Sequence, residues 1–587
     1  MYKKETDYPS IDRTHEKDEK YFDVHPIIPS LSIYNAIKLI SSLYKKENAI
    51  DCLELNISYE ELISKAATLS KAFKELGIKA GEIITVSMPN FYQAVLVYLA
   101  ANRIGAVTTF LNPFASVEEI EGYLNLFESP LFINYDKNNE YNERIKKNTK
   151  IRQIVTLSKK DLNNKKFADS TSITIGNSDY LSFSEMGLVA DYYKKPFKTL
   201  YGGDQESLIL FTSGTTGNPK AVVLTNRNIL SSGLYMKNST HLTNTKGEKS
   251  LVCVPFTYPY GFATSTLMSL LCGREAILAP NLTDENISYF LSKNPNIVFG
   301  SPALLELIKR NIPTEQDLSS IHTFISGGDF LTPSQANNGI DFFRKHNANV
   351  VICNGSGNAE TVGANTNAVG LENKPETVGR ILLGSSPIII DQETGEELKY
   401  GEEGLLCISG KHVFKKYFNE PELTEKAKFY YKGKEYFRTG TRGFLDKDGY
   451  FTLTGRDSRF YIISTLNKIY CDYVQNIMSI IDIVDACAVV KKPNDEMLYT
   501  GKAFVVLKDG IVPTDEIKDY ILSQCALQLT SSNGEKFQLK PYEIPTSIEF
   551  VKELPRTQAD KIDYPILEHF ANEEYEKEKG KAKKLTL

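Results

Sequence analysis

A run of hydroxyl and glycine residues between two apolar segments is the part of this sequence best suited to chemistry. Segment 208–229 reads LILFTSGTTGNPKAVVLTNRNI. Glycine allows the backbone to turn its N–H groups inward, the hydroxyls add further donors, and a lysine adds positive charge. This combination suits a triphosphate, so the sequence predicts a phosphate-binding loop. Its predicted binding residues are Thr212, Ser213, Gly214, Thr215, Thr216, Gly217 and Lys220.

The predicted loop is not a Walker A motif. That motif ends in Gly-Lys followed by Ser or Thr, whereas Lys220 is preceded by Pro219 and followed by Ala221. An ordinary Ser/Thr/Gly turn is the alternative interpretation. The unbroken order of the segment 211–220 between two apolar strands argues against it. The sequence therefore indicates a different kind of phosphate site.

The elements around the loop alternate in the manner of an α/β protein. Apolar strand-like runs at 82–88 and 106–111 alternate with helical patterns that begin near Tyr92 and Ser116. Buried parallel strands read as continuous apolar runs, so we expect parallel-rich sheets flanked by helices. Further strand-like runs lie at 130–135, 153–157, 296–300, 323–327 and 349–355.

The character of the sequence changes near Val378. Residues 378–457 read as short strands joined by glycine-rich turns, which predicts a β-rich subdomain. A smaller α+β unit follows, and the likeliest boundary is at Asp457–Ser458. The expected organisation is a large N-terminal domain, 1–457, and a small mobile C-terminal domain, 458–587. The charged tail 572–587 is expected to be frayed or disordered.

Composition excludes several classes of protein. The 587 residues are too many for one core, and a formal net charge of −5 offers no basic field for nucleic acid. The N-terminus is polar and contains no apolar signal run. The most apolar span, 91–107, is interrupted by Asn102 and Arg103, which favours a buried helix. We therefore expect a cytoplasmic protein without a transmembrane segment.

Cysteine and histidine are both dispersed along the chain. None of the eight cysteines forms a CxxC pair, and most stand in apolar runs. Buried reduced thiols are expected rather than a disulfide or zinc framework. No pair among the seven histidines has metal-ligand spacing.

Several segments together resemble the motifs of the adenylate-forming superfamily, which includes acyl- and aryl-CoA synthetases, luciferases and peptide-synthetase adenylation domains. FTSGTTGNPK is similar to the phosphate-loop signature, and LPRTQADKIDY (554–564) is similar to the C-terminal catalytic-lysine motif. The resemblance covers nearly the whole chain in the right order. The other matching segments are SYEEL (58–62), AANRIGAVTTFLNP (100–113), VCVPFTYPYG (252–261), ISGGDFLTP (325–333), NGSGNAET (354–361) and YFRTGTRGFLDKDGYFTLTGR (436–456).

The resemblance implies that ATP activates a carboxylic acid as an acyl-adenylate, and that the acyl group then passes to coenzyme A. Lys561 would bridge the substrate carboxylate and the α-phosphate, and Arg456 would contact the ribose or the α-phosphate. Glu360 and Thr216 would bind Mg²⁺, and Ser458 would be the hinge for rotation of the small domain. The implied adenine and ribose side consists of Gly327, Gly328, Asn354, Gly355, Ser356 and Thr441, and the implied acyl pocket consists of Tyr258 and Gly261.

Several positions depart from the family pattern, and most of them concern the nucleotide. Ser356 replaces an aromatic residue that stacks on adenine, a contact of about 1 kcal/mol. Thr441 replaces an Asp that accepts hydrogen bonds from both ribose hydroxyls, a loss of roughly 1.5–3 kcal/mol. Ala359 replaces a Thr, and Asp560 replaces the Gly before Lys561. The groups at the reacting centre are retained, so an active enzyme with degenerate nucleotide motifs is expected.

The acyl substrate is the least readable feature. The segment PFTYPYGFA (255–263) contains no acid to hold the ammonium group of an amino acid, which favours a fatty or aryl carboxylate, most simply a fatty acid. Tyr258 stands where many relatives have His, and it either gates the pocket or is a core tyrosine. The chain shows no carrier sequence with an attachment serine. Coenzyme A or a separate acyl carrier protein is therefore the expected acceptor, and a non-catalytic adenylate- or acyl-binding homologue is the remaining alternative.

Overall fold

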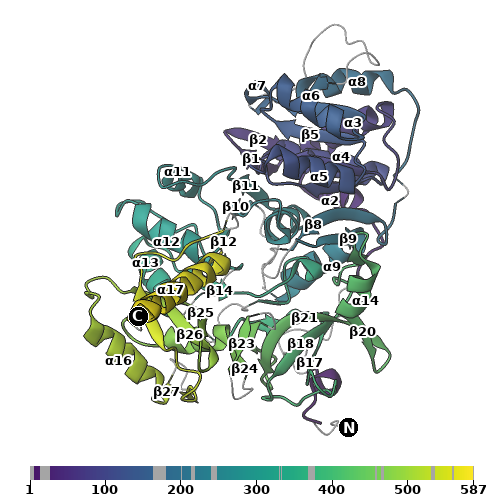
Figure 1. The fold of residues 1–587 in the computed structure, drawn as a ribbon. Helices are drawn as coiled ribbons and strands as arrows, with labels where there is room; N and C mark the ends of the chain where they lie inside the picture. The colour runs from purple at the N-terminus through teal and green to yellow at the C-terminus, as the bar shows by residue number, and fades with distance from the viewer. Residues whose placement is uncertain are drawn as a thin grey trace.

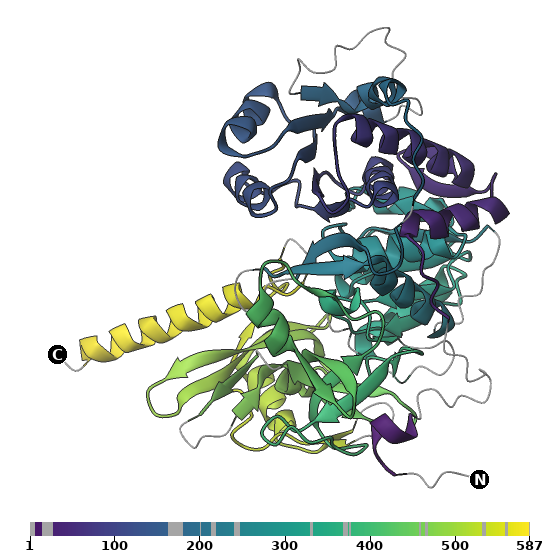
Figure 2. The same cartoon turned by 90° about the vertical axis from the view of Figure 1, so that its right-hand side faces the viewer.

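The computed structural model shows two large sheets, a β-rich region and a C-terminal unit, each with its own helices (Figures 1 and 2). None of the helices within the described ranges is long and apolar enough to cross a membrane. The structure describes residues 6–13, 27–162, 180–199, 201–212, 219–239, 247–328, 331, 333–367, 374, 377–456, 459–463, 468–530, 536–557 and 561–585.

The first large sheet has seven strands in the order β14-β13-β12-β10-β11-β1-β2. All neighbours are parallel except β2, which is antiparallel to β1. Its two faces belong to separate cores, since Phe324 and Ile325 point into different clusters. The elements are β1 (Asn48–Cys52), β2 (Leu55–Ser58), β10 (Lys249–Val252), β11 (Glu275–Leu278), β12 (Ile297–Gly300), β13 (Thr323–Ser326), β14 (Val351–Asn354), α10 (Met268–Leu271), α11 (Ile287–Ser292), α12 (Pro302–Asn311) and α13 (Pro333–Lys345).

The second large sheet has eight strands in the order β19-β9-β8-β4-β3-β5-β6-β7. The strands from β8 to β7 are parallel, and β9 is antiparallel to both of its neighbours, β8 and β19. The strands are β3 (Ile83–Ser87), β4 (Val107–Phe110), β5 (Leu131–Tyr135), β6 (Gln153–Leu157), β7 (Tyr180–Ser182), β8 (Glu206–Phe211), β9 (Ala221–Thr225) and β19 (Lys416–Tyr417). The helices of this part are α2 (Ile33–Leu43), α3 (Tyr59–Glu75), α4 (Tyr92–Ile104), α5 (Val117–Leu126), α6 (Asn139–Asn148), α7 (Lys159–Leu162), α8 (Met186–Tyr192) and α9 (Asn226–Ser239).

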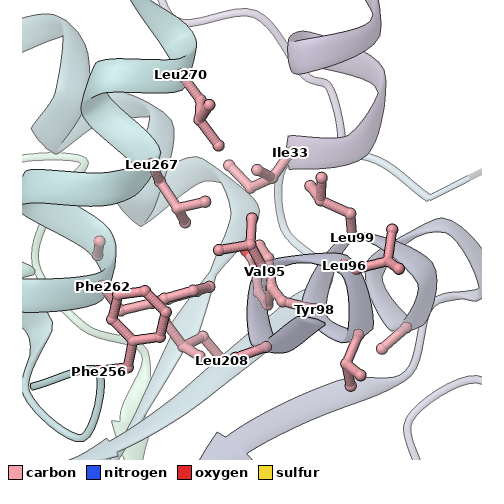
Figure 3. Packing of buried hydrophobic residues seen from close by; sticks show 14 of the residues in the cluster. Ile33, Val95, Leu96, Tyr98, Leu99, Leu208, Phe256, Phe262, Leu267 and Leu270 are labelled. Carbon is pink, nitrogen blue, oxygen red and sulfur yellow. The ribbon is translucent and has the colours of Figure 1, made fainter. Parts of the chain in front are cut away.

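A continuous apolar core joins the two large sheets and positions the segment that follows Tyr258. Helix α4 is buried along nearly its whole length, which confirms the buried helix predicted for 91–107. Tyr98 of α4 packs edge-on against Phe262 of the π-helix η3 (Tyr260–Leu267), with 5.0 Å between ring centroids (Figure 3). Because η3 is fixed by this contact, the residues at its start are held against the ends of the first sheet.

The β-rich region is antiparallel, in the order β17-β18-β21-β20 with β22 on β21, and it confirms the prediction of a β-rich part of the chain. The N-terminal helix α1 (Pro9–Asp12) docks on this region, where Ser10 donates to the Glu397 carboxylate through its backbone N–H (2.9 Å) and Oγ (2.7 Å) (Figure 1). The elements are β15 (Thr366–Asn367), β16 (Arg380–Ile381), β17 (Ser386–Ile390), β18 (Gly404–Ser409), β20 (Lys428–Tyr431), β21 (Lys434–Leu445), β22 (Phe451–Arg456) and α14 (Pro421–Ala427).

The C-terminal unit is α+β, as predicted. Strands β25 and β26 form a long hairpin, and β29 lies parallel to β26. The predicted boundary at Asp457–Ser458 falls outside the described residues. The elements are β23 (Phe460–Ile462), β24 (Lys468–Tyr470), α15 (Cys471–Met478), β25 (Val484–Asn494), β26 (Leu498–Leu507), α16 (Asp515–Cys525), β27 (Leu529–Thr530), β28 (Lys536–Phe537), β29 (Ser547–Phe550) and α17 (Tyr564–Leu585).

The expectation of a frayed tail is wrong for the described residues. Helix α17 runs to Leu585, and its far end projects from the body of the molecule (Figure 2). Glu574 pairs with Lys492 at 3.2 Å and also with Lys502. Both lysines lie in the β25–β26 hairpin and are buried, so the helix supplies counter-charges that these lysines require.

Other sequence predictions are confirmed. The apolar runs predicted as strands form β3, β4, β5, β6, β12, β13 and β14, and the helices predicted near Tyr92 and Ser116 form α4 and α5. All eight cysteines are free thiols, and each is buried except Cys253, which is partly exposed. The SYEEL segment has a local role, because Ser58 and Glu61 form a capping box that starts α3.

Candidate active site

A cavity of about 1420 Å³ opens where the ends of β8, β13 and β14 meet the β-rich region, residues 552–556 and Lys561. Its described wall contains eight Lys or Arg residues against four Asp or Glu residues, an excess of positive charge that suits a polyanion. The predicted site residues on this wall are Thr212, Lys220, Tyr258, Gly327, Gly328, Gly355, Ser356, Glu360, Thr441, Arg456 and Lys561.

The base of the predicted phosphate loop is closed by two hydrogen bonds. The Thr212 N–H donates to the Lys220 carbonyl, and the Lys220 N–H donates to Thr212 Oγ1, both at 3.0 Å. Because β8 and β9 are antiparallel neighbours, this pair brings the two ends of the loop together. The loop residues between them lie outside the described residues, namely Ser213, Gly214, Thr215, Thr216 and Gly217, as does the predicted hinge residue Ser458.

Glu360 is a buried carboxylate beside a lysine and a tyrosine. It lies in the 3₁₀ turn η4 (Ala359–Thr361) and is 6% exposed. Tyr417 Oη donates to Glu360 Oε1 at 2.6 Å, and Lys220 Nζ lies 5.2 Å from the centre of the Tyr417 ring. Burial raises the pKa of Glu360, although the Tyr417 hydroxyl, a backbone N–H and the Lys220 charge oppose that rise. A cation delivered to this carboxylate would favour its ionised form.

Two buried polar atoms lie at the neighbouring ends of β13 and β14. Ser326 and Asn354 are register partners in this parallel pair. Neither Ser326 Oγ nor Asn354 Oδ1 has a hydrogen-bond partner within the described part of the chain, although Asn354 Nδ2 donates to the Leu331 carbonyl at 3.4 Å. Asn354 lies just behind the wall that Gly355 and Ser356 form. Unsatisfied buried acceptors beside a cavity indicate a ligand that carries donors.

Thr441 and Arg456 are directly opposed across the β21–β22 ladder. Thr441 is 6% exposed, and its N–H donates to Thr439 Oγ1 at 3.1 Å. The Arg456 N–H donates to Asp472 Oδ2 at 2.9 Å, which ties the end of β22 to α15. The ladder therefore places a hydroxyl and a guanidinium side by side on the cavity wall.

Lys561 reaches the cavity from the C-terminal unit. A Cβ built on Gly328 would lie 3.7 Å from Lys561 Cε, so the lysine packs against the glycine segment after β13. The segment that carries Lys561 is folded back on itself, because the Thr557 N–H donates to the Lys561 carbonyl at 2.7 Å. Gly328 and Lys561, which are far apart in the sequence, thus lie on one wall of the cavity.

The predicted acyl-pocket residues divide between the wall and the packing behind it. Tyr258 lines the cavity, and burial raises its pKa. Gly261 does not line the cavity. A Cβ built on it would lie 2.3 Å from the Val254 carbonyl oxygen, so this glycine is packed tightly against backbone. Tyr260 takes the wall position instead, and its hydroxyl donates to the Ile325 carbonyl at 2.6 Å. Gly261 therefore permits close backbone packing at the start of η3.

Sequence reasoning missed several residues of the wall. The cavity is also lined by Tyr417, Tyr260 and Asn367. Tyr260 lies in the predicted pocket segment 252–261, whereas Tyr417 and Asn367 lie outside every motif identified in the sequence. Tyr417 contacts Glu360 across 57 positions of sequence. A signal was available only for Tyr260, because aromatic residues near a predicted pocket segment are candidates for its lining.

Comparisons with known proteins identify the family of this chain. The family described as AMP-binding enzyme matches residues 44–418, and the AMP-binding enzyme C-terminal domain matches residues 474–561. The long-chain-fatty-acid–CoA ligase of Bacillus subtilis (strain 168) is 26% identical over 547 residues, which cover 91% of this chain and 94% of that protein.

One further relative and one solved structure are named for substrates other than a long-chain fatty acid. The D-alanine–D-alanyl carrier protein ligase of Listeria monocytogenes serotype 4b is 28% identical over 382 residues, which cover 63% of this chain and 71% of that protein. Among solved structures, the anthranilate CoA ligase AuaEII in complex with anthranoyl-AMP aligns with a TM-score of 0.76 and 19% identity over 92% of this chain and 97% of that one. The chain belongs to the AMP-binding enzyme family, and so to the adenylate-forming superfamily that its motifs resemble.

Proposed function

We propose that this protein activates a carboxylic acid with ATP as an acyl-adenylate and then transfers the acyl group to coenzyme A. The observation that carries the proposal is the meeting of Lys220, Glu360 and Lys561 on one cavity wall in a chain of the AMP-binding enzyme family. The first step joins a carboxylate to a phosphate, and both are anions. A cationic wall therefore supplies what that step requires.

The reacting groups are assigned to the described cations. Lys220, at the closed base of the phosphate loop, binds the β- and γ-phosphates. Lys561, packed against Gly328, bridges the acid carboxylate and the α-phosphate and neutralises the charge that builds up as the oxygen attacks phosphorus. Arg456 contacts the ribose or the α-phosphate from the end of β22. Pyrophosphate leaves as the new P–O bond forms.

Glu360 is the proposed Mg²⁺ ligand, with Thr216 as the second. Tyr417 donates to Oε1 of this carboxylate. Within the described residues there is no group of three or more His, Cys, Asp and Glu side chains that could hold a metal. A single carboxylate fits Mg²⁺, which nucleotide sites hold through one or two carboxylates and the substrate phosphates. When bound, the ion neutralises phosphate charge.

The far end of the nucleotide is proposed to be weakly held. Asn354 Oδ1 is an unsatisfied acceptor suited to the exocyclic amine of adenine. Ser356 offers no ring for stacking, and Thr441 offers a neutral hydroxyl where relatives place a charged acceptor. These two positions are the degenerate part of the site, and we expect a high Michaelis constant for ATP.

The second step depends on the acceptor of the acyl group. We propose that a small domain, 458–587, turns about Ser458 relative to a large domain, 1–457, so that a thiol can reach the adenylate. Coenzyme A is the primary candidate, supported by the similarity to a long-chain-fatty-acid–CoA ligase across 91% of the chain. A separate acyl carrier protein is the second candidate, supported by the similarity to a carrier-protein ligase.

ATP–pyrophosphate exchange with a panel of fatty and aryl acids tests the proposal. Exchange that depends on an acid and on Mg²⁺ is expected for at least one member of the panel. A folded protein that exchanges pyrophosphate with none of them would contradict the enzyme assignment and favour a non-catalytic adenylate- or acyl-binding protein. Adding coenzyme A or a carrier protein to the adenylate complex then identifies the acceptor.

A further inference from the structure

The cavity wall near Gly355 contains a buried amide oxygen that has no hydrogen-bond partner among the described residues. Asn367 lies in the short strand β15, lines the cavity and is 1% exposed. Its Oδ1 accepts no hydrogen bond from any residue that the structure describes. Buried polar atoms in folded proteins are nearly always satisfied. An unsatisfied acceptor on a cavity wall therefore points to a donor on the molecule that fills the cavity.

The neighbours of Asn367 fix the orientation of its amide. Nδ2 faces Met236 Sδ at 3.8 Å, and a thioether sulfur can only accept. The flipped amide would place two acceptors against each other. Oδ1 is directed toward Gly355, where a Cβ built on the glycine would lie 4.0 Å away. Since Gly355 lines the cavity and has no side chain, it leaves room beside this buried oxygen.

Threonine hydroxyls on the same wall are already engaged. Thr366 Oγ1 donates to the Val378 carbonyl at 2.5 Å, and Thr264 Oγ1 donates to the Val362 carbonyl at 2.7 Å. Neither hydroxyl proton is available to Asn367. These bonds also keep the threonines from competing for a polar ligand.

Other neighbours of Asn367 include an arginine and two apolar residues. Arg380 is the cross-strand partner of Asn367, and its guanidinium lies 5.8 Å from the centre of the Tyr450 ring. Met236 and Ala364 are apolar residues of the same wall. An uncharged amide oxygen suits a hydroxyl group better than an ammonium group, which requires a carboxylate to compensate its charge.

We propose that Asn367 is a specificity-determining residue that selects a carboxylic acid with a hydroxyl group on its carbon skeleton. The hydroxyl would donate to Oδ1 between Gly355 and Met236 while the rest of the skeleton packs on apolar wall. This inference rests on the proposed function, and it narrows the substrate from fatty or aryl acids in general to their hydroxylated members. A site with a buried acceptor rejects the analogue that lacks the donor, because the acceptor is then left unpaired.

Paired acids test this selection in the ATP–pyrophosphate exchange assay with the full-length protein. The pairs are octanoate with ω-hydroxyoctanoate and phenylpropanoate with its para-hydroxyphenyl counterpart. In the pair that supports the faster exchange, we expect kcat/KM to be about tenfold higher for the hydroxy acid than for its partner. Asn367→Leu removes the acceptor, and we expect the ratio within that pair to fall to about one. The ratio is measured within one protein, so a general loss of activity cancels.

Two further variants keep the test decisive. Asn367→Val serves if the leucine variant does not fold. Asn134→Leu makes the same change at another buried amide with an unpartnered Oδ1, in the second large sheet and away from the cavity wall, and its ratio should equal that of the wild type. Equal rates for both members of each pair, or a ratio that survives loss of the Asn367 amide, would overturn the inference. If none of the acids supports pyrophosphate exchange, that result would instead overturn the proposed function.

Discussion

Replacing Thr441 with Asp tests the proposal that the ribose end of the nucleotide is weakly held. Thr441 lies on the cavity wall, is 6% exposed and is opposed by Arg456 across the ladder. Its backbone is fixed by the hydrogen bond from its N–H to Thr439 Oγ1. An Asp side chain at this position carries its carboxylate into the cavity without a change in the strand.

The size of the effect follows from the burial and the neighbouring charge. Hydrogen bonds from ribose hydroxyls to a charged acceptor contribute roughly 1.5–3 kcal/mol. Burying the carboxylate opposes this gain, and the adjacent Arg456 guanidinium offsets part of the cost. We expect a net gain of about 1.4 kcal/mol, which corresponds to a KM for ATP about tenfold lower than that of the wild type.

The assay is ATP–pyrophosphate exchange at a saturating acid concentration with ATP varied. Thr441→Asn is the matched control, because it has nearly the same shape as Asp but no charge, and its KM should change less than that of the Asp variant. Thermal unfolding of each variant checks that the fold is retained. A KM for ATP that is unchanged or higher in a folded Thr441→Asp protein would refute the reasoning and show that other groups hold the ribose.

Two other predictions concern buried groups. Tyr417→Phe removes the donor to Glu360 Oε1, and since burial already raises the pKa of Glu360, the Mg²⁺ concentration for half-maximal exchange should rise about tenfold; an unchanged magnesium titration would argue against the assigned ligand. Burial lowers the pKa of His412 from 6.5 to about 3, so the unfolded state binds the extra proton and stability falls as pH drops below 6.5. Urea unfolding should show that, as pH falls below 6.5, the free energy of unfolding of the wild type drops by about 1.4 kcal/mol more per pH unit than that of His412→Leu. Parallel pH profiles for the two proteins would contradict this prediction.

The strands of the two large sheets were predictable because they are buried on both faces. The strands within runs such as 82–88 and 323–327 are buried at every position, and a parallel sheet between helices buries such runs completely. The helix at Tyr92 was predictable for the same reason. Local sequence is sufficient where burial is uniform.

The tail and the cavity wall show where local sequence is insufficient. Glu574 reads as part of a solvated charge run, and only the distant hairpin with Lys492 and Lys502 explains why the helix continues. Tyr417 is separated from Glu360 by 57 positions, so no local spacing reveals their hydrogen bond. The unpartnered oxygen of Asn367 becomes visible only when burial and neighbours are known.

Formation of the acyl-adenylate by wild type and by Lys561→Ala is the measurement that tests the central claim most directly. In a single turnover with labelled ATP and an acid that supports exchange, wild type should accumulate the acyl-adenylate, and Lys561→Ala should form it about 100- to 1000-fold more slowly. Lys577→Ala, which changes a lysine of α17 that is 75% exposed, should match the wild type. An undiminished rate in the Lys561 variant, or no acyl-adenylate from the wild type, would contradict the account.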